Sequence, residues 1–393
     1  MLPLSQAFFM KNIILYLTFL ITTIFSPELL AQKAYVDNIC WDIAAQIPPT
    51  FKQDKSLGLA GTVIGIIGPK LLIAGGTNFP DQMPWDGGKK SYYNDVFLYK
   101  ISARGLFLDT SDTQFKLPFN LAYGAVCSTP YGIVIAGGEN EKGLSKKVLL
   151  LNWKAGRLTI DYLPDLPEGL TNGALTAIEN KLYLAGGEVG GGATDQFLSL
   201  DLKSQNEGWN KLACLPQAVS HTVLLSREEK GAHEIYLISG RKRNIGDTST
   251  LYNEMYSFNV KQQVWQAKKS LPYPISAATG IIKGQSILIF SGDTGETFHK
   301  VEKLIATIDL EKDPTKKEAL NQEKIKLQRS HPGFSKTVLK YDLVAGIWTT
   351  LKSKMPYGTV TTNAVLANNQ VIVAGGEIRA GVRTPNIIVG KFK

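Results

Sequence analysis

A short phrase that recurs six times is the feature that most constrains how this chain can fold. Each copy is a run of β-branched and other apolar residues that ends in a pair of small residues. The pairs are Gly75-Gly76, Gly137-Gly138, Gly186-Gly187, Ser239-Gly240, Ser291-Gly292 and Gly375-Gly376. Three of the intervals between successive pairs are close to a period of about 50 residues. A unit of this length cannot bury its apolar face alone, so the repeats predict one large ring of stacked units.

Each repeat can be divided into four short strands. A strand of small residues such as 173–178 comes first, and the strand that ends in the glycine pair follows. A third strand is rich in aromatic residues, as in 252–258, and a fourth carries a tryptophan such as Trp265. Paired glycines permit backbone conformations that a Cβ would forbid where chains crowd together near an axis. The pattern resembles the kelch repeat and predicts an all-β propeller with six blades.

The last repeat lacks a tryptophan strand of its own. It has strands at 361–366, 370–375 and 384–389, and then the chain ends. The segment 39–44 contains Trp41 and is left over at the other end of the chain. We therefore expect this N-terminal strand to complete the last blade, which would remove two exposed strand edges.

A charged insert at 296–335 interrupts the fifth repeat. Its middle, 314–327, is rich in Lys, Glu and Leu and follows Asp313, which is a typical N-cap residue, so it predicts a helix. One interpretation is solvated decoration of the surface. We favour the other, in which the insert is a helical flap over a binding face.

The first 31 residues have the pattern of a secretory signal peptide. A charged start at Lys11 is followed by the apolar run 13–25 and by small Ala31 before Gln32. The alternative, a retained membrane anchor, is disfavoured because the run is short for a membrane span. We expect a periplasmic or secreted protein whose residues 32–393 form a single propeller domain.

Charge and the metal-ligating residue types narrow the class of partner. The formal net charge of +9 favours anionic ligands, but no basic run alternates with aromatic residues as in proteins that bind single-stranded nucleic acid. The scattered cysteines Cys40, Cys127 and Cys214 do not form a disulfide framework or a metal clip. The four histidines show no ligand spacing; they are His221, His233, His299 and His331.

The loops that follow the small-residue pairs are expected to meet on one face of the ring. Strands alternate in direction within a blade, so all six of these loops leave the same side near the axis. They begin with Thr77-Asn78, Glu139-Asn140, Glu188-Val189, Arg241-Lys242, Asp293-Thr294 and Glu377-Ile378. A central pocket lined by charged groups on this face is therefore the predicted site.

Glu377 differs from the other two glutamates in these loops because Arg383 follows six residues later. The two side chains can face one pocket from opposite arms of a single loop. Arginine can hold a carboxylate through two parallel hydrogen bonds, and a partly buried glutamate can exchange protons with a sugar hydroxyl. From the residues alone, a purely structural Glu–Arg salt bridge is an equal alternative.

The segment 375–384 resembles the Gly-Glu-x-x-x-Gly-Leu-Arg-Thr motif of the bacterial sialate mutarotases, the N-acetylneuraminate epimerase family. Segments 75–80 and 87–95 resemble a long loop of that family, and the charged insert resembles its large helical loop. The order of blades departs from the family pattern, since the Glu/Arg blade comes last here. The chain is therefore similar to the cyclically permuted branch.

This resemblance implies an isomerase that interconverts the anomers of N-acetylneuraminate by acid–base opening and closing of the ring, without a cofactor or metal. It implies proton transfer by Glu377, and for Arg383 a role in holding the substrate carboxylate or in stabilising charge on the opened sugar. Asn78 and Arg241 are further candidates for binding hydroxyls or the carboxylate. The main rival is a non-catalytic kelch module that binds a glycan or a protein. A copper oxidase on a similar ring is disfavoured by the histidine spacing.

Overall fold

The computed structural model describes residues 38–393, apart from 51–52, 103, 111–114 and 230–231. The predicted signal peptide at 1–31 lies outside the described residues. The described residues belong to one compact unit by their internal contacts. Within the described part of the chain, we find no helix that is long and apolar enough to cross a membrane.

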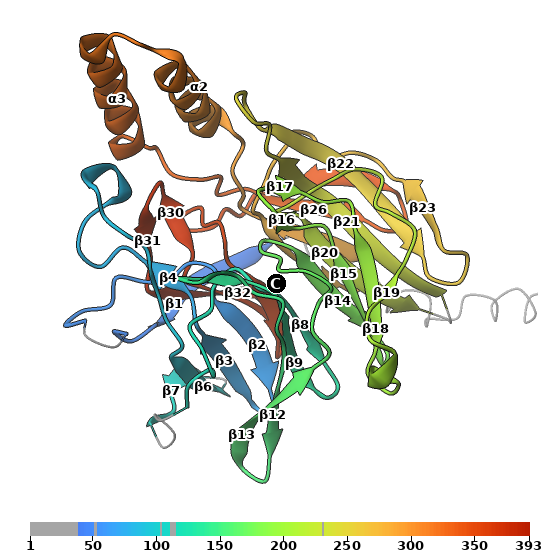
Figure 1. Ribbon diagram of the computed structural model, residues 1–393. Coiled ribbons are helices and arrows are strands. Elements are labelled where there is room, and N and C mark those ends of the chain that lie inside the picture. The colour runs from blue at the N-terminus through green and yellow to red at the C-terminus, as the bar shows by residue number, and fades with distance from the viewer. Residues whose placement is uncertain (1–37, 51–52, 103, 111–114, 230–231) are drawn as a thin grey trace, which may run out of the picture. The chain divides into compact units, whose positions relative to one another are not determined.

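Six four-stranded sheets surround a common axis (Figure 1). The first blade contains β2 (Val63–Ile67), β3 (Lys70–Ala74), β6 (Val96–Ser102) and β7 (Gly105–Leu108). The second contains β8 (Ala125–Thr129), β9 (Gly132–Ala136), β12 (Val148–Lys154) and β13 (Arg157–Leu163). The third contains β14 (Ala174–Ile178), β15 (Lys181–Ala185), β18 (Phe197–Asp201) and β19 (Asn210–Lys211). The first three repeats thus each form one antiparallel sheet, as predicted.

The second half of the ring follows the same plan. The fourth blade contains β20 (Val223–Glu229), β21 (Ala232–Lys242), β22 (Thr250–Asn259) and β23 (Val264–Ala267). The fifth contains β24 (Thr279–Lys283), β25 (Ser286–Phe290), β26 (Val338–Asp342) and β27 (Ile347–Thr350). The sixth contains β28 (Ala364–Ala367), β29 (Gln370–Ala374), β32 (Asn386–Phe392) and β1 (Ile39–Gln46). The predicted six-bladed all-β propeller is confirmed.

The small-residue pairs are explained by contacts between neighbouring blades. Gly137 has a φ of +69°, and a Cβ there would lie 2.4 Å from the carbonyl oxygen of Leu170 in the next blade. Gly186 has the same relation to Val219, with a Cβ-to-oxygen distance of 2.2 Å. A side chain would have to push the blades apart, so glycine sets how closely the blades approach.

The N-terminal strand closes the ring, as predicted. β1 pairs antiparallel with β32, from Ile39 opposite Phe392 to Gln46 opposite Asn386. Trp41 on β1 meets the ring of Phe290 in the fifth blade edge-on, with 5.8 Å between ring centroids. β1 and β32 thus belong to one sheet that also packs against the fifth blade.

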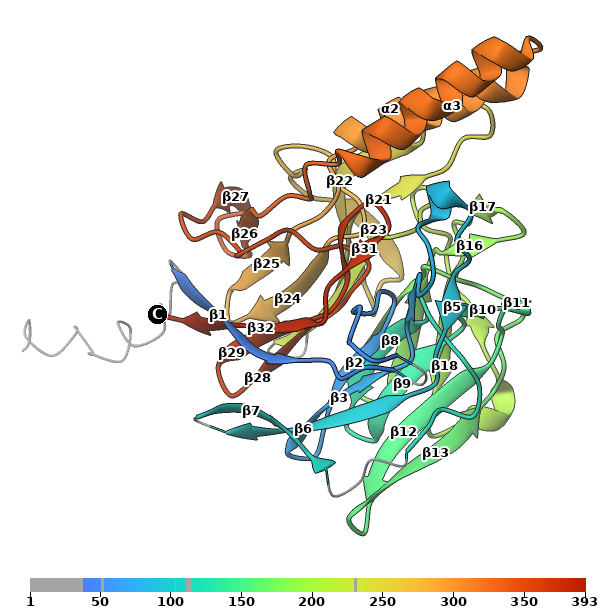
Figure 2. The same ribbon diagram turned by 90° about the vertical axis from the view of Figure 1, so that its left-hand side faces the viewer.

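The insert in the fifth blade consists of two helices, α2 (Glu296–Leu310) and α3 (Pro314–Arg329). Asp313 caps α3 as predicted, because its side chain accepts hydrogen bonds from the backbone N–H groups of Thr315 and Lys316. Figure 2 shows the two helices side by side over one face of the ring. Glu302 of α2 accepts hydrogen bonds from the backbone and hydroxyl of Ser249, at 2.8 and 2.6 Å. These two hydrogen bonds attach the insert to the fourth blade.

A second attachment joins α3 to the first blade. Arg329 forms an ion pair of 2.6 Å with Asp86, which belongs to the short 3-10 helix η2 (Pro84–Asp86) in the long loop of that blade. This pair is largely exposed, so it contributes little to stability. It does show that the insert reaches across the face from the fifth blade to the first.

A ring of residues with positive φ surrounds the axis just before the first strand of each blade. Its members are Gly61, Tyr123, Asn172, His221, Ala277 and Thr361. Five backbone hydrogen bonds link successive members around the ring, with N–O distances of 2.8 to 3.0 Å. The six residues surround a constriction of about 80 Å³. They therefore separate the two ends of the axial space.

Candidate functional site

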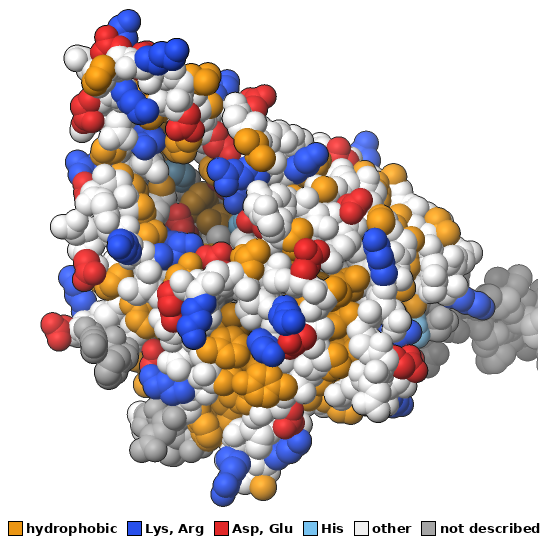
Figure 3. Space-filling model, in the orientation of Figure 1, with side chains coloured by type: hydrophobic (Ala, Val, Ile, Leu, Met, Phe, Trp, Pro, Cys, Tyr) orange, Lys and Arg blue, Asp and Glu red, His pale blue; other side chains and the backbone are white. Residues whose placement is uncertain are grey.

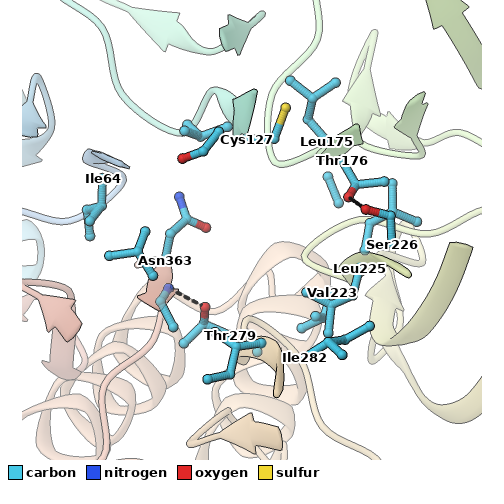
Figure 4. Close-up of a pocket in the computed structure, with 18 of the residues that line it drawn as sticks. Ile64, Cys127, Leu175, Thr176, Val223, Leu225, Ser226, Thr279, Ile282 and Asn363 are labelled. Carbon is cyan, nitrogen blue, oxygen red and sulfur yellow. Dashed lines mark hydrogen bonds between the residues drawn. The ribbon is translucent and has the colours of Figure 1, made fainter. Parts of the chain in front are cut away.

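Two larger spaces lie on either side of this constriction. The first strands of the blades line an axial channel of about 410 Å³ (Figure 4). Its lining side chains are apolar or uncharged polar groups. Lining hydroxyls can bind one another, as where the Thr176 hydroxyl donates a hydrogen bond to the Ser226 hydroxyl at 2.8 Å. The lining includes no charged side chain that could bind an anion or transfer a proton. The channel is therefore a weaker candidate site than the space on the opposite side.

That second space is a cavity of about 390 Å³ beneath the helical insert. Figure 3 shows it as a hollow between the helices and the ring. Its polar wall contains His221, Arg241, Asp293, Gln328, His331 and Glu377. Its apolar wall includes Phe298, Val301, Ile305, Phe334 and Val360. Because α2 and α3 supply part of both walls, the insert covers the cavity as the flap interpretation predicted.

Glu377 begins a small hairpin formed by β30 (Glu377–Arg379) and β31 (Val382–Arg383). Glu377 and Arg383 are cross-strand partners in this hairpin, so their side chains meet. The Arg383 Nη2 lies 3.2 Å from one carboxylate oxygen of Glu377, and the backbone N–H of Gly381 donates to the other at 2.9 Å. Both oxygens are held from within the hairpin, and the carboxylate is still about 19% exposed toward the cavity.

Arg383 is more deeply buried than its partner, with only 4% of its side chain exposed. Its guanidinium lies over the ring of Phe79, 4.6 Å from the centroid. Its Nε and Nη1 have no hydrogen-bond partner among the described residues. Tyr123 also faces this group: burial raises the pKa of Tyr123, and the charges of Arg383 and Lys90 oppose that rise.

A second polar cluster lies across the cavity and joins the third and fourth blades. Glu188 accepts a hydrogen bond from the Ser220 hydroxyl at 2.9 Å, and the Nδ1 of His221 lies 3.6 Å from the same carboxylate oxygen. The Nη2 of Arg241 lies 3.5 Å from the Nε2 of His221 and 3.9 Å from Glu188. A guanidinium only donates, so Nε2 accepts and Nδ1 carries the proton of the neutral imidazole. Burial, reinforced by Arg241, lowers the pKa of His221 well below its usual value.

Arg241 connects this cluster to the insert. Its guanidinium lies over the ring of Phe298 of α2, 4.8 Å from the centroid. Its Nε has no hydrogen-bond partner among the described residues, and its two polar contacts are long. Arg241 is thus a loosely held cation in the cavity wall, as expected for a group that binds an anion.

Asn78 is placed differently from the other predicted site residues. It is 1% exposed and is not among the residues that line the cavity. Its amide oxygen accepts from Tyr93 at 2.8 Å and Gln53 at 3.3 Å, and its amide nitrogen donates to the backbone oxygen of Gly58. The structure therefore brings together Glu377, Arg383 and Arg241, and uses Asn78 to hold a loop.

Several residues of the site were not predicted from the sequence. Tyr123 and His221 occupy the positive-φ position before a first strand, and His331 and Phe298 come from the insert. Alignment of the repeats on their first strands could have shown that Tyr123 and His221 share one position near the axis. Among the described residues, no cluster of three or more His, Cys, Asp or Glu side chains is arranged to hold a metal ion.

Comparison with known proteins agrees with this architecture. A solved chain described as the structure of YjhT superimposes with a TM-score of 0.61 over 90% of this chain and 98% of its own length, at 12% identity. At this identity the likeness shows the fold alone. The superposition is consistent with the six-bladed ring.

Sequence comparison reaches further. N-acetylneuraminate epimerase of Brucella suis is 31% identical over 148 residues, which are 35% of this chain and 36% of the relative. The enzyme of the same name from Salmonella typhi is 30% identical over 115 residues, which are 27% of this chain and 28% of the relative. The enzyme from Vibrio vulnificus is 27% identical over 130 residues, which are 30% of this chain and 32% of the relative. The chain thus spans about a third of the length of the curated relatives it matches.

A model of the N-acetylneuraminate epimerase family matches residues 163–393. This segment is more than half of the chain. It includes the third, fourth and fifth blades, three of the four strands of the sixth blade, the helical insert and the hairpin that holds Glu377 and Arg383. On this match, the chain belongs to the N-acetylneuraminate epimerase family.

Proposed function

We propose that this protein is a mutarotase that interconverts the anomers of free N-acetylneuraminate. The observation that carries the proposal is the Glu377–Arg383 hairpin, which presents a fixed carboxylate to a cavity that also contains Arg241. The cavity volume of about 390 Å³ is in the range of small-molecule sites. Family membership supports the choice of a sialic acid as the substrate.

The proposed reaction needs only proton transfer. N-acetylneuraminate is a 2-keto acid closed as a hemiketal. When a base removes the proton of the anomeric hydroxyl and the ring oxygen receives a proton, the ring opens to a ketone. Rotation and closure on the other face give the second anomer, with no net change in protons. Glu377 is the proposed base, and general acid–base catalysis of this kind contributes about 10²–10⁴-fold.

The contacts of the two arginines suggest a division of roles that differs from the simplest sequence interpretation. Arg383 is buried and paired with Glu377, so we assign it to hold that carboxylate and to balance charge as the sugar opens. Arg241 lines the cavity and has weak internal partners, so we assign it to the substrate carboxylate. The planar guanidinium is suited to bidentate binding of a carboxylate.

The apolar wall provides for the rest of the substrate. Phe298, Val301 and Phe334 also line the cavity. They would pack against the C–H face of the sugar and the methyl group of the acetamide. A wall of this kind also excludes water, which strengthens the electrostatic interactions of the polar wall.

The decisive test is proton NMR exchange spectroscopy on N-acetylneuraminate with and without the purified protein. We expect exchange between the α and β anomers to be much faster than in buffer alone. The methyl glycoside of the same sugar cannot open, so it should bind without exchange and report affinity separately. Binding of the free sugar with exchange at the buffer rate would instead identify a glycan-binding module.

We also propose that the protein is periplasmic or secreted, on the basis of the signal-peptide pattern at 1–31. N-terminal sequencing of protein recovered from cell fractions would test this. We expect a mature N-terminus near Gln32 in the exported fraction. An uncleaved chain in the membrane fraction would favour a retained anchor.

A further inference from the structure

The chain segment that follows α3 brings a histidine into the cavity wall. His331 lies two residues after the end of α3, is 8% exposed and lines the cavity together with Glu377 and Asp293. Its ring packs against Phe334, with 4.8 Å between ring centroids. A Cβ on Gly333 would lie 3.4 Å from the backbone oxygen of Ile378, so this segment passes close to the Glu377 hairpin.

A backbone hydrogen bond fixes which nitrogen of His331 carries the proton. The N–H of Gly333 lies 3.0 Å from the Nδ1 of His331. A backbone N–H can only donate, so Nδ1 is the acceptor, and the proton of the neutral imidazole lies on Nε2. Among the described residues, Gly333 is the hydrogen-bond partner of Nδ1 and none is found for Nε2, which leaves the Nε2 proton for a ligand in the cavity that His331 lines.

The charged groups around His331 are compatible with a neutral ring. Burial lowers the pKa of His331, Arg379 reinforces this, and Asp293 and Glu377 oppose it. Across the cavity the cationic group is Arg241, and α2 contributes uncharged side chains to this wall. The imidazole is thus a neutral donor that cannot also act as a base through Nε2.

We propose that His331 donates a hydrogen bond from Nε2 to the ring oxygen of the sugar as the ring opens, opposite the proton transfer at Glu377. Glu377 removes the proton of the anomeric hydroxyl, the bond between the anomeric carbon and the ring oxygen breaks, and the electron pair of that bond goes to the ring oxygen. The N–H of His331 stabilises the negative charge there until a proton arrives from Glu377 or from water. Donors aimed at the position where charge develops act more strongly in the transition state than in the ground state.

This inference rests on the proposed mutarotase function, and it gives the insert a role beyond covering the cavity. The helices α2 and α3 place His331, because the segment that carries it runs directly from the end of α3. The insert then supplies the proposed donor to the ring oxygen, while the fourth blade supplies Arg241.

The test compares His331→Gln, which keeps a neutral N–H near the position of Nε2, with His331→Leu, which does not. We expect His331→Leu to slow anomer exchange by about 10²-fold, while the affinity for the non-opening methyl glycoside changes less than threefold. His331→Gln should recover most of the rate. His233→Leu is the matched control, since that histidine lies on β21 beside Glu179, outside the cavity lining, and should exchange at the wild-type rate.

Other outcomes separate the two proposals. If wild-type protein does not accelerate exchange, the mutarotase function and this inference both fail. If wild-type protein is active and His331→Leu equals it, or His331→Gln is as slow as His331→Leu, only the role of His331 is overturned. A ¹⁵N NMR spectrum of the imidazole supplies an independent readout. Protonation of Nε2 alone near pH 7 supports the inference, whereas protonation of Nδ1 contradicts it.

Discussion

Three glutamates occupy equivalent positions in the second, third and sixth blades, yet their surroundings differ. Glu139, Glu188 and Glu377 each follow a glycine pair and begin a two-stranded hairpin. Each also pairs through its backbone with the residue just before the positive-φ position of its own blade. The backbone therefore presents three carboxylates near the axis in the same way.

Their partners determine what each carboxylate can do. Glu139 is occupied by Lys90 at 2.9 Å and the Tyr92 hydroxyl at 2.8 Å, both from the first blade. Glu188 accepts from Ser220 and supports the His221–Arg241 contact. Glu377 is paired with a buried arginine of its own hairpin and lines the cavity. The repeat therefore determines where each glutamate lies. The neighbouring cation determines its role: Glu139 is bound by a lysine of another blade, whereas Glu377 is held by the arginine of its own hairpin and remains open to the cavity.

The largest expected effect separates Glu377 from Glu139. Glu377→Gln preserves shape but removes the titratable group, so exchange should fall by about 10²–10⁴-fold with little loss of binding. Glu139→Gln is the matched control in an equivalent hairpin and should exchange at close to the wild-type rate. Measurement is by NMR exchange on both variants. A fully active Glu377→Gln protein would leave Glu377 and Arg383 as a structural salt bridge.

The next effect distinguishes the two arginines. Arg241→Lys keeps the positive charge but loses the planar guanidinium that can donate two parallel hydrogen bonds. KM should therefore rise roughly tenfold, which corresponds to the loss of one charged hydrogen bond, with little change in kcat. Arg383→Lys should instead lower kcat, because it disturbs how Glu377 is held. Saturation kinetics by NMR would measure both. The reverse pattern would assign the substrate carboxylate to Arg383.

A smaller effect concerns the pH dependence of stability near Glu188. The pKa of His221 is lowered in the folded state, so the unfolded chain binds a proton more readily. Stability from this group is present above its unfolded pKa of about 6.5 and declines below it, by up to about 1.4 kcal/mol per pH unit. Denaturant unfolding between pH 7.5 and 5 should show this decline. His221→Asn suits the positive φ of 53° and should flatten the slope; an unchanged slope would contradict the prediction.

The smallest effect is on the stability of the Glu139 hairpin. The Lys90–Glu139 pair is partly exposed, so Glu139→Gln should change the free energy of unfolding by about 1 kcal/mol or less. Chemical denaturation at low and high salt would measure this. A loss of several kcal/mol would show that Glu139 carries more of the blade contact than its exposure suggests.

The parts that the sequence predicted depend on local pattern. The small-residue pairs, the leftover Trp41 strand and the Asp313 cap each signal their structure within a few residues. The Glu377–Arg383 contact was predictable for the same reason, since the two are cross-strand partners in one short hairpin. The fold and the centre of the site were therefore accessible before any coordinates.

The remaining site residues depend on contacts between distant segments. No sequence pattern shows that Phe298 of the insert lies against Arg241 of the fourth blade. The sequence also gives no sign that the side-chain amide of Asn78 is already hydrogen-bonded. Its partners are Gly58, Tyr93 and Gln53. His331 gained its position from the end of a helix whose placement depends on attachments to two blades. These arrangements result from packing around the ring rather than from local propensity.

The pairing of β1 with β32 affects the order in which the blades can form during synthesis. Gln46 and Asn386, whose side chains hydrogen-bond across this sheet, are separated by 340 positions in the chain. A ribosome makes β1 long before β32, so β1 cannot pair with β32 until the strands between them have been made. The blade that carries Glu377 is therefore the last of the six to be completed.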